Sequence, residues 1–161
     1  MVVVDGGGER VLIDPLLLDP TGTTTLDAWQ PSKEGDLLAY QVSSGRTEES
    51  VLHVLDVATG DGVDGPIDRA RYSPVAWVPG GESFYYVRRL PPEQLPPDEQ
   101  QYHRQVWRPR VGAGPALDVE VFGAGPEPTS DFGVTVSRAG RWLTVSASAG
   151  TAPAPTSGSR T

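Results

Sequence analysis

Short apolar runs separated by glycine-containing polar turns recur along this chain. In the central copy, apolar runs at 72–78 and 84–87 flank a turn at 79–83. Aromatic and β-branched residues favour strands, and glycine supplies the positive φ that tight hairpin turns need. The central copy therefore predicts a β-hairpin with Gly80 and Gly81 in its turn.

The same arrangement occurs before and after the central copy. The three turn glycines, Gly35, Gly81 and Gly140, lie 46 and 59 residues apart, and the longer interval contains a proline-rich stretch at 90–101. We interpret this stretch as a loop insertion, without which the two intervals would be nearly equal. A repeat of about 40 to 50 residues with four strands per unit is typical of a β-propeller.

The pattern predicts an all-β fold, a partial β-propeller of about two and a half four-stranded antiparallel blades. No window keeps a helical apolar period, so almost no helix is expected. The predicted propeller domain spans 1–152, and the polar segment 153–161 is predicted to be a disordered tail. The expected strands are 26–29, 37–42, 50–57 and 63–67, then 72–78, 84–88, 105–111 and 117–122, then 132–137 and 142–148, after a hairpin of 2–4 with 10–13.

Composition narrows the function classes. The 161 residues include 21 acidic and 13 basic side chains, a single lysine, Lys33, and no cysteine. A net charge of −8 argues against nucleic-acid binding and against an anionic membrane surface. No apolar run is long enough to span a bilayer, and the first residues lack the pattern of a signal peptide. We therefore expect a cytoplasmic protein without disulfides.

Candidate catalytic and metal-binding groups are sparse in the sequence. The nucleophile motif Gly-x-Ser-x-Gly is missing, and His53 and His103 lack metal-ligand spacing. We expect a structural role for His53, in the middle of a predicted strand, and solvent exposure for His103. Asp131-Phe132-Gly133 matches a kinase motif only by coincidence, because no glycine-rich phosphate loop accompanies it. No catalytic, metal-binding or cofactor-binding residue is predicted.

Seven ordered motifs give the chain a family resemblance, and four of them show its extent. They are Val11-Leu-Ile-Asp-Pro15, Trp29-x-Pro-Ser-x-x-Gly-x-Leu-Leu-Ala-Tyr40, Ile67-x-Arg-Ala-Arg-Tyr-Ser-x-Val-Ala-Trp77 and Val136-Ser-x-x-Gly-Arg-Trp142. Together the motifs resemble the N-terminal propeller of prolyl oligopeptidase-type serine peptidases. The sequence departs from the family at Pro109, where the family favours histidine. Since proline cannot donate to a ladder, the predicted strand should be interrupted or bulged there.

The resemblance implies a seven-bladed propeller covering an α/β-hydrolase domain that carries a Ser-Asp-His triad and cleaves short peptides after proline. The chain would then be the substrate-gating part of such a serine-type endopeptidase, inactive alone, with the hydrolase domain and short peptides as partners. In the family, the aromatic residue of the Arg-[Phe/Tyr]-Ser motif can line the substrate site. That residue is Tyr72, and the alternative is that it packs between blades. A free-standing interaction module without enzymatic activity is the alternative function.

An incomplete ring also predicts exposed apolar surface. Each end of the arc should leave one blade face uncovered, and aromatic residues of the end blades should lose contacts. We therefore expect a marginally stable chain that self-associates or partly unfolds. The aromatic residues concerned are Trp29, Trp77, Tyr85, Tyr86 and Trp142.

Overall fold

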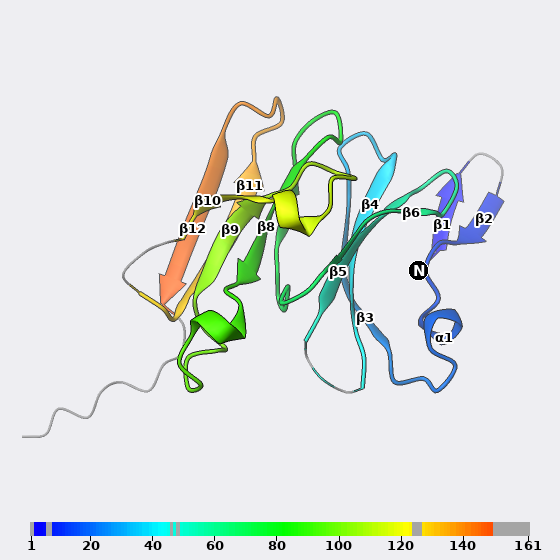
Figure 1. Cartoon of the computed structure of the whole chain (residues 1–161). Helices are drawn as coiled ribbons and strands as arrows, with labels where there is room; N and C mark the ends of the chain where they lie inside the picture. Colours follow the sequence, from blue (N-terminus) through cyan, green and yellow to red (C-terminus); the bar gives the residue numbers. More distant parts are fainter. Residues whose placement is uncertain (1, 6–7, 46, 48, 124–126, 150–161) are drawn as a thin grey trace, which may run out of the picture.

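Two four-stranded antiparallel sheets stand side by side at the centre of the molecule, with a two-stranded hairpin at each end (Figure 1). The structure is a computed structural model that describes residues 2–5, 8–45, 47, 49–123 and 127–149. Within each central sheet the strands pair in chain order, as in a propeller blade. The all-β prediction is confirmed, whereas the predicted tail, 153–161, lies outside the described residues.

The strands follow the predicted repeat closely. The first blade contains β3 (Thr25–Pro31), β4 (Leu37–Ser43), β5 (Val51–Asp56) and β6 (Gly62–Ile67). The second contains β7 (Val75–Trp77), β8 (Phe84–Arg89), β9 (Arg104–Arg108) and β10 (Val119–Phe122). The end hairpins are β1 (Val2–Asp5) with β2 (Gly8–Val11), and β11 (Ser130–Val136) with β12 (Leu143–Ala149). Among the described residues, helix is confined to single turns, α1 (Pro15–Leu18), η1 (Pro92–Gln94) and η2 (Pro115–Leu117).

Two boundaries in the second blade depart from the sequence pattern. The predicted first strand, 72–78, is wrong at its start, because β7 begins only at Val75 and Tyr72 lies in the preceding turn. The predicted third strand ends early, since β9 stops at Arg108, directly before Pro109. The expected interruption at this proline is thus confirmed, and its cause is the missing backbone donor.

A shared apolar core joins the first blade to the second. Trp77, Phe84 and Tyr86 of the second blade are almost fully buried, and the rings of Trp77 and Phe84 lie 4.8 Å apart between centroids. The indole Nε1 of Trp77 also donates a hydrogen bond of 2.9 Å to the carbonyl oxygen of Gln30 on β3. The first blade contributes four buried residues to this core, Ala39, Leu52, Val54 and Ile67.

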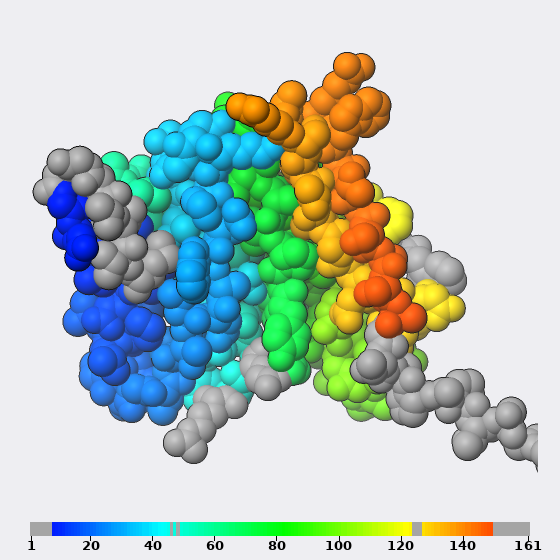
Figure 2. Space-filling model, turned by 180° about the vertical axis from the view of Figure 1, so that it is seen from behind, coloured from blue at the N-terminus to red at the C-terminus, as the bar shows by residue number. Residues whose placement is uncertain are grey.

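The opposite face of the second blade is buried as well. Val87 and Val106 pack there against Val134 and Val136 of β11, in a second apolar core. A sheet covered on both faces has apolar residues at successive positions, and this accounts for the nearly continuous apolar runs of the second blade. In the space-filling view, the blue first blade, the green second blade and the orange hairpin form adjoining columns (Figure 2).

The turns between the first and second strands of the three units contact one another, the first turn reaching both the second and the third. Glu34 Oε1 accepts a hydrogen bond of 2.8 Å from the backbone nitrogen of Gly80, and Lys33 Nζ donates one of 2.6 Å to the carbonyl oxygen of Ser137. Gly140 adopts a φ of 72°, and a Cβ atom built there would lie 2.6 Å from Pro79 Cδ. The third turn therefore needs glycine for its conformation and for its approach to the second turn.

The expected exposure at the ends of the arc is found for single aromatic residues, whereas a wholly uncovered apolar blade face is not seen in the described part of the chain. At the first blade, Ile13 is 3% exposed and packs against Leu38 and Leu55, so the segment after β2 covers this face. On the hairpin β11–β12, the residues on the face opposite the second blade's core are polar or glycine, namely Gly133, Thr135, Thr144, Ser146 and Ser148, while Asp131 reaches back to Arg104 of β9. Exposure of single aromatic residues does occur, with Trp29 at 55% and Trp142 at 65%.

Covering of the first blade by Ile13 yields a stability prediction. Ile13→Ala should lower the free energy of unfolding by about 2 to 5 kcal/mol, because it removes buried methyl groups and leaves a cavity. The matched control is Leu17→Ala on α1, where the side chain is 81% exposed and the change should be small. Urea unfolding followed by circular dichroism measures both. Equal effects of the two substitutions would show that the segment does not cover the blade.

Candidate functional site

Tyr72 lies in the turn that connects the first blade to the second, just before β7. Its φ is 55°, in the left-handed region that costs a non-glycine residue about 1 to 2 kcal/mol. Three hydrogen bonds hold the turn at the next residue. Ser73 N donates to the carbonyl oxygen of Ala70 (3.0 Å), Gln41 Nε2 donates to the carbonyl oxygen of Ser73 (2.7 Å), and Val87 N donates to Ser73 Oγ (2.8 Å). Both blades therefore fix the backbone that presents Tyr72.

The side chain of Tyr72 projects from this turn and is 71% exposed. The guanidinium carbon of Arg71 lies 4.8 Å from the centroid of the tyrosine ring. Within the part of the chain that the structure describes, Tyr72 thus lies at the surface and is not buried between blades. It lines two hollows, one toward the first blade and one toward the β11–β12 hairpin.

The hollow toward the first blade has a volume of about 670 Å³. Leu26, Asp27 and Ala28 of β3 form one wall, while Tyr72 and Pro74 form another. The carboxylate of Asp27 accepts a hydrogen bond of 3.0 Å from Ser43 Oγ and one of 2.7 Å from Ser50 Oγ. Its walls combine apolar side chains, an aromatic ring and one oriented carboxylate.

The hollow toward the hairpin has a volume of about 480 Å³. Tyr102 and Phe132 contribute aromatic surface, and Arg104 forms an ion pair of 3.1 Å with Asp131. Since Tyr72 borders both hollows, its ring stands between a first-blade wall and a third-unit wall.

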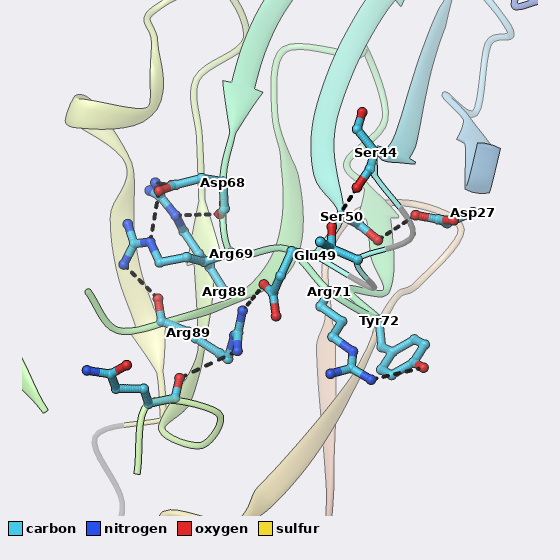
Figure 3. A network of polar contacts seen from close by, with 12 residues as sticks. Asp27, Ser44, Glu49, Ser50, Asp68, Arg69, Arg71, Tyr72, Arg88 and Arg89 are labelled. Atoms are coloured by element: carbon cyan, nitrogen blue, oxygen red, sulfur yellow. Dashed lines mark hydrogen bonds and ion pairs between the residues drawn. The ribbon is translucent and has the colours of Figure 1, made fainter. Parts of the chain in front are cut away.

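Arginine side chains link the connecting turn to both blades (Figure 3). Arg88 pairs with Asp68, and Arg89, which is only 9% exposed, pairs with Glu49 just before β5. Burial acts to raise the pKa of Asp68, but hydrogen bonds from Arg88 and Arg69 outweigh it and lower the pKa. The ionised network therefore ties the turn that carries Tyr72 to the end of β8 and to the first blade.

A family model described as the prolyl oligopeptidase N-terminal beta-propeller domain matches residues 2–159. The chain belongs to this family. Two curated relatives are prolyl endopeptidases, from Elizabethkingia meningoseptica (28% identical over 142 residues) and Elizabethkingia miricola (27% over 143). Each alignment covers 88% of this chain and 20% of the relative, so the chain spans about a fifth of their length.

Solved structures of prolyl oligopeptidases have the same fold. One, from a study of inter-domain dynamics in two prolyl endopeptidases, is 35% identical, with a TM-score of 0.74, and the match covers 92% of this chain and 20% of that one. The apo structure of prolyl oligopeptidase B from Galerina marginata is 21% identical, with a TM-score of 0.75, covering 92% and 22%. The two central sheets are accordingly blades of a prolyl oligopeptidase propeller.

Asp27 is a site residue that the sequence pattern did not reveal. The ladder between β3 and β4 shifts register between Leu26 and Ala28, so Asp27 is the extra residue of a β-bulge. A bulge places one extra residue opposite its partner strand, redirects that side chain and offsets the alternation beyond it by one position. Nothing in the alternation of the sequence predicts which residue occupies such a bulge, nor that Ser43 and Ser50 meet its carboxylate.

The two histidines have structural surroundings. His53 on β5 stacks on Tyr40, with 5.3 Å between ring centroids, and its burial lowers its pKa. The expectation that His103 is simply solvated is wrong, because His103 Nε2 lies 2.6 Å from Glu99 Oε2 and its backbone nitrogen donates to Pro128. Asp131, from the kinase-like motif, lies on β11 in a regular ladder.

Among the described residues, no group of three or more histidine, cysteine, aspartate or glutamate side chains could hold a metal ion. None of the helices in the described ranges is long and apolar enough to cross a membrane.

The lowered pKa of His53 predicts a pH dependence of stability. Because the unfolded chain binds a proton near pH 6.5 and the folded chain only at lower pH, stability should be lost as pH falls below about 6.5. In His53→Phe, which keeps an aromatic ring on Tyr40, the loss between pH 7.5 and 5 should be smaller. Urea unfolding at each pH measures it, with His103→Gln as the control that retains the loss. An identical pH profile in His53→Phe and the wild type would contradict the assignment.

Proposed function

We propose that this chain is the substrate-gating propeller portion of a prolyl oligopeptidase-like serine endopeptidase, which acts on short proline-containing peptides, and that Tyr72 contacts the peptide. The observation that carries the proposal is the position of Tyr72. A large aromatic side chain is held 71% exposed on a left-handed turn that both blades anchor. A conformation that costs free energy and exposes an aromatic ring is typical of a binding site.

The division of labour within the proposed enzyme follows from the sequence. Peptide-bond hydrolysis by a serine peptidase needs an activated nucleophile, a base and an oxyanion site held together. The sequence lacks the Gly-x-Ser-x-Gly motif that presents such a nucleophile in α/β-hydrolases. We therefore assign hydrolysis to a separate α/β-hydrolase domain and assign substrate contact and filtering to the blades.

Binding of a peptide to the chain tests this proposal. A blocked proline-containing pentapeptide, acetyl-Ala-Nle-Ala-Pro-Ala-amide (Nle, norleucine), should shift the amide resonances of Tyr72 and Ser73 in a titration followed by NMR. Tyr72→Ala should weaken binding about tenfold, the loss expected for one buried aromatic contact, with little change in melting temperature. Tyr72→Phe should retain most of the affinity, because the ring supplies the contact area.

Controls separate contact from folding and from catalysis. Trp142→Ala removes an equally exposed aromatic residue at the start of β12 and should leave peptide affinity unchanged. The chain should release no product from the pentapeptide. Affinity that is insensitive to Tyr72→Ala would contradict the proposed contact, and cleavage that depends on a serine of this chain would contradict the assignment of hydrolysis.

A further inference from the structure

Asp27 lies in β3 but does not take part in its regular pairing with β4. As the extra residue in the bulge between Leu26 and Ala28, it leaves the regular ladder of β3 and β4. Bulges of this kind re-aim side chains and are frequent beside binding sites. The re-aimed carboxylate lies on the wall of the hollow that Tyr72 also lines.

Two buried serines orient the carboxylate. Ser43, 8% exposed at the end of β4, donates to Oδ1, and Ser50, 4% exposed just before β5, donates to Oδ2. An ionised carboxylate has about four acceptor positions, so each oxygen can accept a further hydrogen bond. An asparagine at this position, although neutral, could also bridge the two serine hydroxyl groups. The bridge alone therefore does not require the negative charge of an aspartate.

Within the described part of the chain, Asp27 has two serine hydrogen-bond partners but no ion-pair partner. The ion pairs of the described residues involve Asp68, Glu49, Glu99 and Asp131, and none of them reaches Asp27. Within the same hollow, the ring of Tyr72, which already lies 4.8 Å from the guanidinium carbon of Arg71, supplies an aromatic wall of the kind that cations contact. Leu26, Ala28 and Pro74 supply apolar surface for the methylene groups of a long cationic side chain.

We propose that this hollow binds a positively charged group of the substrate peptide, either a lysine or arginine side chain or a free N-terminal ammonium, with Asp27 as the charged partner and Tyr72 as the aromatic wall. The inference rests on the proposed function, since it assumes that a peptide reaches Tyr72. It adds a charge preference to that function: peptides with a cationic group should bind in preference to neutral peptides of the same shape.

The experiment compares peptides that differ only in charge, using the full chain and NMR titration at low ionic strength. The set is acetyl-Ala-X-Ala-Pro-Ala-amide with X as lysine, arginine or norleucine, plus the norleucine peptide with a free amino terminus. The lysine or arginine peptide should bind about tenfold more tightly than the norleucine peptide, a typical gain for one charge-assisted contact. A preference for the free amino terminus over its acetylated form would identify the N-terminal ammonium as the source instead.

Two variants locate the charge preference. Asp27→Asn keeps the shape and one acceptor, and it should reduce the preference to less than about threefold. Glu120→Gln, on the exposed strand β10, removes the same charge elsewhere and should retain the preference. Circular dichroism and the melting temperature check that each variant is folded. If asparagine disturbs the bulge, Asp27→Glu serves as a further variant, because it retains the charge and should keep part of the preference.

Each remaining outcome overturns the inference in a distinguishable way. If all peptides bind equally and Tyr72→Ala weakens them all, the proposed peptide contact holds and the charge preference is refuted. A preference that survives Asp27→Asn would place the cation elsewhere. If no peptide of the set binds, the proposed contact and the charge preference both fail, and Asp27 is only an internal bridge between β4 and β5.

Discussion

The apolar core between the first and second blades is the interaction on which the rest of the structure depends. Trp77, Phe84 and Tyr86 fill the space between two sheets that the chain itself joins only through the connecting turn. Burial of each such side chain contributes about 1.5 to 3 kcal/mol, a substantial part of the 5 to 15 kcal/mol that typically separates folded from unfolded domains. Separation of the blades would expose these rings to water and lose the free energy of their burial, so the two blades stabilise each other.

This core also positions the candidate site. The connecting turn begins where β6 ends, and Ala70 of that turn is itself part of the core, fully buried. Ser73 receives hydrogen bonds from Gln41 of the first blade and from Val87 of the second, so its position depends on the distance between the two sheets. Tyr72 is thereby presented on rigid structure, although it lies outside any strand, and a change in the joint would move it relative to Asp27.

Much of the fold follows from the sequence, because burial of both faces of a blade imposes continuous apolar runs, and turn glycines such as Gly81 and Gly140 mark the hairpins. The start of β7 was predicted too early, since Tyr72 favours strands and precedes an apolar run, whereas hydrogen bonds from Gln41 and Val87 hold Ser73 in a turn. The packing of Ile13 on the first blade depends on the path of the chain in space, which the pattern of apolar residues does not reveal. The bulge at Asp27 could not be predicted either, because the residues on each side of it alternate as in a regular strand.

Hydrogen–deuterium exchange of the chain and of Trp77→Phe tests the mutual dependence of the blades most directly. The substitution removes the hydrogen bond to Gln30 and part of the ring volume from the core. The account predicts that amides of β4 and β5 in the first blade lose as much protection as those of β8 in the second, because the sheets open together. Loss of protection confined to β7 and β8, with β4 and β5 unchanged, would show that the blades fold independently and would contradict the account.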